Sequence, residues 1–206
     1  YDGTNLHWVW SNESPTYDAS NYQNGFVAFG TRRDRFDFGL GHDEIVRFDK
    51  NHPGLLDAVD IFIENYVAMF GNHFKDVYRN NEEVILFTEF FGDNSFAGQH
   101  EKNDSFHLKP IDLMIDGKMM LPDNFYKEFG CHVGSGEGRF TPKVVYKGKY
   151  NGQFVEDVRN GKFGVDEGVV CKGVVNGEAV MTKIKTYEYM DRLKEKFGNG
   201  WESYWE

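Results

Sequence analysis

Hydrophobic positions between residues 53 and 78 recur at steps of three and four, the period of an α-helix with one buried face. Pro53 stands where the first turn of a helix tolerates proline, because the N–H groups of that turn have no intrahelical partner. The pattern therefore predicts one long helix over 53–78, with Gly71 as its point of interruption. The apolar positions that show the period are Leu55, Leu56, Val59, Phe62, Ile63, Tyr66, Val67, Phe70, Phe74 and Val77.

Short runs of aromatic and β-branched residues predict strands elsewhere, since such side chains fit a pleated, half-buried surface. The runs at 6–10 and 25–29 predict a hairpin, and Asn176-Gly177 is a strong signal for a two-residue hairpin turn. Antiparallel strands with interspersed helices predict an α+β domain rather than a doubly wound parallel sheet. Further strands are expected at 83–91, at 106–121 with a break at Pro110 and a turn at Asp116-Gly117, at 168–175 and at 179–185, and shorter helices at 122–129, 153–160 and 187–197.

The chain has 206 residues and neither an internal repeat nor a linker composition, so we expect a single domain over 1–206. Its 19 Phe and 11 Tyr residues exclude a disordered chain, and no apolar run approaches the ~20 residues of a membrane-spanning helix. The two cysteines lack C-x-x-C spacing, which favours a reducing compartment. We therefore expect a cytoplasmic monomer of phage or bacterial type, with no membrane partner.

The formal net charge of −10 argues against attraction of the whole surface to nucleic acid or to an anionic membrane. Any site for a polyanion must therefore be a local basic cleft. Affinity for nucleic acid without divalent metal should then be weak and should fall steeply with salt.

Charged residues stand within segments that otherwise read as buried strands. Glu89 lies mid-strand among apolar residues, where a carboxylate is tolerated only on a polar face or in an ion pair. Glu167 and Lys172 bracket the strand 168–172, and Lys183 and Lys185 occupy positions i and i+2 of its partner strand, on one face. Two lysines beside strand-borne glutamates suit a phosphate chain with a divalent metal.

These segments together resemble, in order and spacing, the motif series of the covalent nucleotidyltransferases, which are ATP-dependent RNA and DNA ligases and mRNA capping guanylyltransferases. The likeness spans nearly the whole chain. It is greatest to the phage-type RNA ligases, whose first motif reads Lys-x-Asp/His-Gly-Thr-Asn. The matching segments are Asp2-Gly3-Thr4-Asn5, Arg32, Phe87-Thr88-Glu89-Phe90-Phe91-Gly92, Ile111-Asp112, Glu167-Gly168-Val169-Val170-Cys171-Lys172 and Lys183-Ile184-Lys185.

The resemblance implies an α+β adenylyltransferase domain with two antiparallel sheets, flanked by helices, around an ATP cleft. In this family a lysine attacks the α-phosphate of ATP, AMP passes to a 5′-phosphate end, and a 3′-hydroxyl displaces it to seal the strand. The motif places that lysine directly before Tyr1, so we expect an upstream segment that delivers it. With about twenty residues after Lys185, no separate OB domain is expected.

The resemblance also implies roles for single residues. Lys183 and Lys185 correspond to the pair that neutralises the α-phosphate, and Glu89 to the glutamate that binds the ribose hydroxyl. Glu167 corresponds to the residue that holds a divalent cation, Mg²⁺ or Mn²⁺. Asn5 corresponds to the residue that orders the phosphate and metal region.

Further positions are expected to contact the nucleotide or the strand end. Arg32 corresponds to the arginine that contacts the ribose or the incoming 5′-phosphate, with Arg33 as the alternative. Asp2, Gly3 and Lys172 belong to nucleotide-binding motifs.

One position departs from the family pattern. Ile111 precedes Asp112 where the family stacks an aromatic ring on the adenine. An aliphatic side chain can still cover a purine face, and Phe106 could supply the ring in another register. Asp112 itself has either a structural or a catalytic role.

Three other functions are weighed against an ATP-dependent RNA ligase. A GTP-dependent mRNA capping guanylyltransferase would use the same motifs with another nucleotide. A noncatalytic module would bind a nucleotide or an RNA end without the attacking lysine. A hydrolase could use Glu89 and Glu167 as a carboxylate pair, but it would leave Arg32, Lys183 and Lys185 unexplained.

Overall fold

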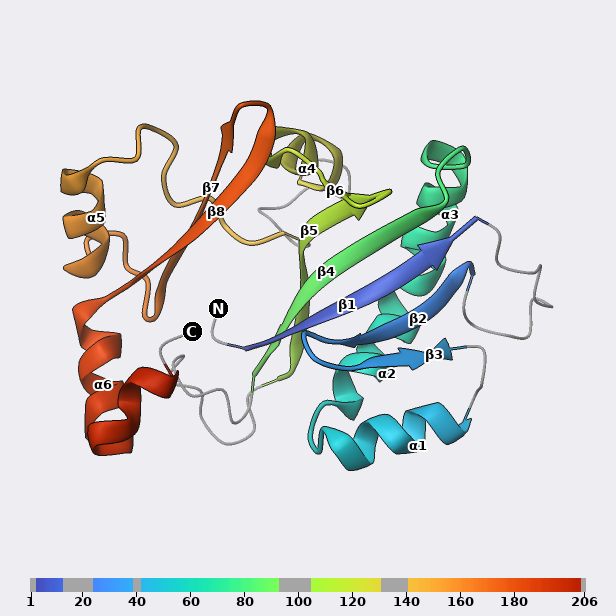
Figure 1. Ribbon diagram of the computed structural model, residues 1–206, viewed down its shortest axis with the longest axis horizontal. Coiled ribbons are helices and arrows are strands. Elements are labelled where there is room, and N and C mark those ends of the chain that lie inside the picture. Colours follow the sequence, from blue (N-terminus) through green and yellow to red (C-terminus); the bar gives the residue numbers. More distant parts are fainter. Residues whose placement is uncertain (1–2, 13–23, 39–41, 93–104, 131–140, 205–206) are drawn as a thin grey trace.

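The computed structural model describes residues 3–12, 24–38, 42–92, 105–130 and 141–204. They form an α+β fold with a six-stranded antiparallel sheet and a separate two-stranded sheet (Figure 1). The order of the large sheet is β3-β2-β1-β4-β5-β6. Its strands are β1 Thr4–Ser11, β2 Phe26–Thr31, β3 Arg35–Asp37, β4 Glu83–Phe91, β5 His107–Ile115 and β6 Lys118–Met119.

The two hairpins expected from the sequence are both present. β1 pairs antiparallel with β2, and β7 (Gly168–Val175) pairs antiparallel with β8 (Glu178–Lys185) to form the small sheet. Asn176 and Gly177 both have positive φ, 52° and 85°, as a two-residue turn of this hand requires. The strand alternation and turn chemistry therefore predicted these elements correctly.

The helical part of the chain differs from the prediction. The segment 53–78 forms two helices that meet at Tyr66, whose φ is −119°, and Gly71 lies inside the second helix. A Cβ at Gly71 would come within 2.5 Å of Asn24, so this glycine permits close packing rather than an interruption. The helices are α1 His42–Asn51, α2 Leu56–Asn65, α3 Val67–Val77, α4 Pro122–Phe129, α5 Gly152–Arg159 and α6 Tyr187–Phe197, followed by the 3₁₀ segment Gly198–Tyr204.

Strand β5 continues through Pro110 instead of breaking there. The pairing with β4 shifts at this point: Thr88 faces Pro110 and Phe87 faces Asp112, so Ile111 is the extra residue of a β-bulge. A bulge absorbs a proline, which has no N–H to donate to the ladder. The added residue also reverses the alternation, which places Asp112 on the same face of the sheet as Phe87.

One face of the large sheet forms the main core. Leu6, Trp8 and Trp10 point to this face and are at most 1% exposed. The Trp8 ring stacks on Phe62 of α2 with 3.7 Å between centroids, and its Nε1 donates to Thr88 Oγ1 at 2.8 Å. Helices α1, α2 and α3 lie on this side of the sheet (Figure 1).

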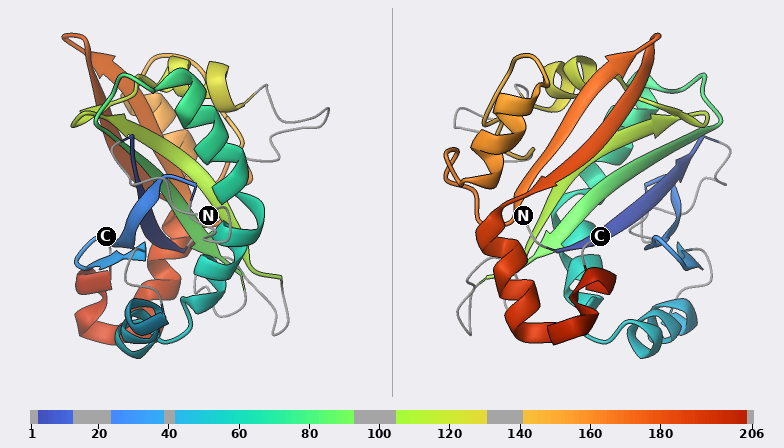
Figure 2. Two further views of the ribbon diagram at one scale, coloured as in Figure 1. Left: turned by 90° about the vertical axis from the view of Figure 1, so that its right-hand side faces the viewer. Right: turned by 60° about the vertical axis from the view of Figure 1, so that its left-hand side comes forward.

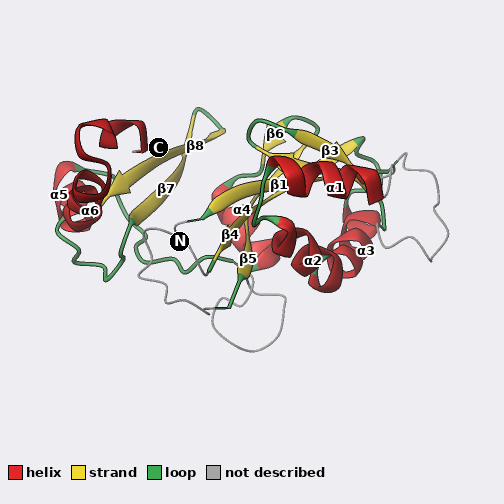
Figure 3. Ribbon diagram, turned by 90° about the horizontal axis from the view of Figure 1, so that it is seen from below, coloured by secondary structure: helices red, strands yellow, loops and turns green. Residues whose placement is uncertain are grey.

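The β7–β8 hairpin lies on the opposite side. It passes in front of β4 and β5 in the right-hand view of Figure 2, and α5 packs on its outer side. Figure 3 shows the hairpin and the large sheet from below, with β1 beginning within the large sheet, where Thr4 pairs with Phe90 of β4. No helix in the described part of the chain is both long and apolar enough to cross a membrane.

Candidate functional site

The large sheet presents polar side chains on the face turned away from its helices. Asn5 of β1 pairs in register with Glu89 of β4, one residue out of phase with the buried Leu6 and Thr88. Because side chains alternate along a strand, Asn5 and Glu89 lie together on the face opposite the core. The sheet therefore fixes this pair by the same alternation that buries its neighbours.

Glu89 is an unusual acid. Its pKa is raised to about 7, chiefly by burial, with the Glu167 carboxylate also raising it and with the Lys183 ammonium and a hydrogen bond from Asn5 lowering it. These influences show that residues from β1, from β8 and from the segment before β7 all lie near one carboxyl group. At neutral pH Glu89 is thus balanced between its neutral and ionised forms.

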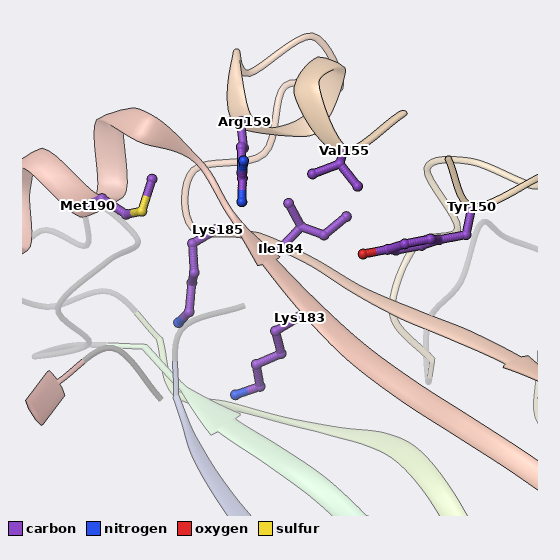
Figure 4. Close-up of a pocket in the computed structure, with 7 residues that line it drawn as sticks. All are labelled: Tyr150, Val155, Arg159, Lys183, Ile184, Lys185 and Met190. Atoms are coloured by element: carbon purple, nitrogen blue, oxygen red, sulfur yellow. The ribbon is translucent and has the colours of Figure 1, made fainter. Parts of the chain in front are cut away.

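The two lysines of β8 face this carboxyl group. In Figure 4 the side chains of Lys183 and Lys185 point away from Val155 of α5 and toward the strands of the large sheet. Lys183 is exposed, whereas the Lys185 side chain is only 5% exposed. The expected placement of both lysines on one face is therefore correct, but only Lys183 stands open to solvent.

Lys185 is held by two neighbouring groups. Its Nζ forms a salt bridge with Glu167 Oε1 and lies 4.6 Å from the centroid of the Tyr189 ring. Thr186 caps α6 by accepting a hydrogen bond from the Tyr189 backbone N–H at 3.1 Å, which fixes that ring directly after the strand. Lys185 is therefore positioned in advance, with Glu167 as its counter-ion.

Gly168 allows Glu167 to reach this position. Its φ is 149°, and a Cβ there would come within 2.0 Å of the Ile184 carbonyl oxygen. The Thr186 backbone N–H also donates to the Glu167 carbonyl oxygen at 2.8 Å. Only glycine permits this close approach of the two chain segments, which explains why glycine follows Glu167.

Lys172 joins the hairpin to the large sheet. Its Nζ donates to the Asp112 carboxylate at 2.7 Å and to the Ile111 carbonyl oxygen at 2.5 Å. The side chains of Lys172 and Asp112 are only 12% and 10% exposed. Burial raises the pKa of Asp112, and Lys172 opposes that rise. The pair is thus a mostly buried tie between β7 and β5, and a contact of Lys172 with a nucleotide remains a prediction.

The remaining predicted residues lie at the same end of the large sheet. Thr31 pairs with Leu6, so Arg32 follows at the end of β2, beside the position of Asn5. A Cβ at Gly3 would come within 2.0 Å of the Phe90 carbonyl oxygen, which explains a glycine there. Asp2 lies outside the described residues.

The two residues considered for contact with the adenine ring, Phe106 and Ile111, lie in different surroundings. Phe106 stacks on the buried Phe90 at 5.3 Å and belongs to the core side of the sheet. Ile111 is half-buried at the bulge, and its carbonyl oxygen accepts the bond from Lys172. The geometry favours Ile111 over Phe106 for contact with a ligand between the sheets.

A small cavity on the outer side of the hairpin is not this site. It has a volume of about 80 Å³ and lies between β8 and α5, with Tyr150, Val155 and Arg159 in its lining (Figure 4). Ligand pockets usually enclose roughly 300 to 1,000 Å³. Lys183 and Lys185 also contribute to its lining, although in Figure 4 their ammonium groups point away from Val155, and the cavity is too small for a nucleotide.

Sequence reasoning left His7 and Arg35 without a role. Gly30 pairs with His7 on one side and with Arg35 on the other, so the three residues form one row across β1, β2 and β3. Burial lowers the pKa of His7, and the Arg35 guanidinium lowers it further. The signal that could have revealed His7 is its position two residues after Asn5, which puts both side chains on one face.

The carboxylates present fit a divalent cation only in combination with a phosphate. The described ranges hold no group of three or more His, Cys, Asp and Glu side chains able to bind a metal alone. Mg²⁺ is commonly held by one or two carboxylates with substrate phosphates and water. Glu167, with Glu89 nearby, matches that requirement.

No family model matches the chain, and no curated protein matches it in sequence. The geometry of these residues is therefore the basis for any assignment of function.

Proposed function

We propose that this protein is a covalent nucleotidyltransferase, an ATP-dependent polynucleotide ligase that joins RNA ends with 5′-phosphate and 3′-hydroxyl groups. The observation that carries the proposal is the approach of Lys183 and Glu167, from the hairpin side, to Asn5 and Glu89 on the large sheet. These residues are far apart in sequence, and the segments that carry them resemble four motifs of that family. The ATP cleft of the proposed fold is the region between the two sheets.

In the first step of the proposed reaction, the uncharged amine of the motif lysine, which the family resemblance puts directly before Tyr1, attacks the α-phosphorus of ATP. A P–N bond forms, the bond between the α-phosphorus and the bridging oxygen breaks, pyrophosphate leaves and the amine loses a proton. Nearby cations lower the pKa of such an amine, which favours its reactive form.

Lys183 and Lys185 act on the charge that builds on the α-phosphate. Fixed cations stabilise a transition state most when they are already in place and shielded from bulk water. Lys185 meets this condition through Glu167 and Tyr189, and Lys183 projects toward the same region. Glu89 accepts a hydrogen bond from a ribose hydroxyl when ionised.

The pair between Lys185 and Glu167 must exchange partners during the reaction. As the phosphates enter, Lys185 turns from the carboxylate to a phosphate oxygen, and Glu167 becomes free to hold Mg²⁺ or Mn²⁺. A bound divalent cation would neutralise phosphate charge and orient the leaving pyrophosphate. The ligand-free pairing thus keeps both groups near their functional positions.

The adenylyl group then moves from the lysine to the terminal 5′-phosphate of the strand, which forms a new phosphoanhydride and breaks the P–N bond. A 3′-hydroxyl attacks that 5′-phosphorus, AMP leaves and the phosphodiester bond is complete. Arg32, at the end of β2 beside Asn5, is placed to contact the incoming 5′-phosphate.

The test is incubation of the protein, with its own residues upstream of Tyr1, with labelled ATP or labelled GTP and Mg²⁺. Acid-stable label from ATP, transferred to a 5′-phosphorylated RNA and followed by sealing, is the expected result. Label from GTP alone would instead identify a capping enzyme. Absence of label from both nucleotides would refute the proposal.

A further inference from the structure

The turn between β2 and β3 gathers positive charge in a chain whose formal net charge is −10. Arg32, Arg33 and Arg35 lie within four residues and are exposed. Asp34, the acid between them, accepts a hydrogen bond from His52 at 2.9 Å instead of pairing with an arginine. The segment therefore presents a local excess of positive charge.

Neither Arg33 nor Arg35 has an ion-pair partner among the described residues. Asp37, the other acid of this segment, does not pair with either of them. The nearby Arg47 differs, since it forms a salt bridge with Glu44 at 2.6 Å and lies over the Phe36 ring. Arg33 and Arg35 thus keep their side-chain hydrogen-bond donors available for a ligand.

His7 adds a hydrogen-bonding group between this turn and the candidate nucleotide site. Gly30 stands between His7 and Arg35 in the row across the sheet and has no side chain to separate them. The His7 ring is half-buried and makes no side-chain hydrogen bond within the described ranges. By alternation it shares its face with Asn5, two residues earlier.

We propose that Arg35 and His7, together with Arg33 in the adjoining turn, bind phosphates in the backbone of the RNA strand whose 5′ end is to be joined. The assignment rests on the proposed function for the position of the 5′ end. Its residues, however, belong to β1, to β3 and to the turn, and they lie outside the lysine and glutamate cluster. They would form the small basic rim that an acidic ligase requires to hold a polyanion.

The alternative phosphate source is the triphosphate tail of ATP. β3 and β4 are separated by β2 and β1, three strand spacings or about 14 Å. The α-phosphate must lie near Lys183, which puts it about this distance from Arg35. A polynucleotide carries a phosphate at every nucleotide, so its backbone can extend along the row across β1, β2 and β3. The geometry therefore favours the strand over the triphosphate.

The experiment compares Arg35→Ala and His7→Gln with the unmodified full-length protein and with Arg79→Ala. Arg79 is exposed, lies in the loop before β4 at the other end of that strand, and serves as the matched control. The probe is a fluorescent, 5′-phosphorylated single-stranded RNA of about twelve nucleotides, within the usual range of such sites. Its affinity is measured by anisotropy over a series of salt concentrations, and the affinity for ATP with Mg²⁺ is measured in parallel.

We expect Arg35→Ala to weaken strand binding about tenfold and to reduce the slope of log K against log salt by about 0.7, the contribution of one phosphate contact. His7→Gln should weaken it about threefold, since a neutral donor contributes less than a charged one. Arg79→Ala should bind like the unmodified protein. The affinity for ATP should not fall in parallel with the affinity for the strand.

Equal strand affinity and equal salt slope for Arg35→Ala and Arg79→Ala would overturn the proposal. Loss of ATP affinity in Arg35→Ala with unchanged strand affinity would also overturn it, because the phosphate would then belong to the nucleotide. If the unmodified protein takes no label from ATP, the ligase function fails. The anisotropy result still decides whether this row binds RNA.

Discussion

The two faces of the large sheet use the same strands for different purposes. On the helix side, Trp8 and Leu86 are fully buried and the contacts are almost entirely apolar. On the other side, at the alternate positions of the same strands, stand His7 and Glu89, both with shifted pKa values. The first face can provide stability without chemistry. The second carries partly buried charge, as functional sites often do.

The largest expected effect lies on the helix side. Trp8→Ala removes a fully buried ring, its stacking on Phe62 and its hydrogen bond to Thr88. It should lower the free energy of unfolding by about 4 kcal/mol. Chemical denaturation followed by circular dichroism measures this loss. A change below about 1 kcal/mol would show that this face does not form the principal core.

The polar face should behave in the opposite way. Lys183→Ala should slow transfer of label from ATP about a hundredfold, or roughly 3 kcal/mol of transition-state stabilisation. Because Lys183 is exposed, the free energy of unfolding should change by less than about 0.5 kcal/mol. Lys149→Ala, also on an exposed lysine, is the control and should leave the rate unchanged. Equal rates for both variants would remove Lys183 from the mechanism.

The ion pair between Asp112 and Lys172 connects the large sheet to the hairpin. Asp112→Ala leaves the mostly buried ammonium of Lys172 with the Ile111 carbonyl oxygen alone. The expected loss is about 3 kcal/mol. Replacing both residues, as Asp112→Leu with Lys172→Met, should recover part of that loss because no charge stays unpaired. A double variant less stable than Asp112→Ala would contradict a purely electrostatic cost.

The smallest effect concerns Glu89 and depends on pH. Its pKa is about 7 in the folded protein and near 4.5 when unfolded, so the fold disfavours the ionised form. The unmodified protein therefore loses stability as pH rises from about 4.5 through 7. Glu89→Gln should be more stable by about 1 to 2 kcal/mol at pH 8 and should show no gain at pH 4. A gain of equal size at both values would mean that ionisation is not the cause.

Much of the strand framework was predictable because its signals are local. Alternation in 83–91 and the Asn176-Gly177 turn predicted β4 and the β7–β8 hairpin with nearly correct bounds. The same period of two placed Lys183 and Lys185 on one face. Such patterns need only neighbouring residues, which a sequence displays directly.

Other features depend on contacts that no local pattern contains. Helix α1 is mostly polar, with Phe48 as its fully buried residue, so it lacked a strong apolar period. The pairing of Asp112 with Lys172 joins positions 60 residues apart. The bulge at Ile111 likewise depends on the pairing of β5 with another strand. The approach of Glu167 to Glu89 likewise requires the hairpin to fold over the large sheet.

The central claim is that the polar face and the hairpin together form a site for covalent nucleotide transfer. The most direct measurement is the intact mass of the protein, with its own upstream residues, after incubation with ATP and Mg²⁺. The account predicts an increase equal to one adenylyl group, reversed by added pyrophosphate and absent without nucleotide. An unchanged mass with both ATP and GTP, in protein that is folded by circular dichroism, would contradict it.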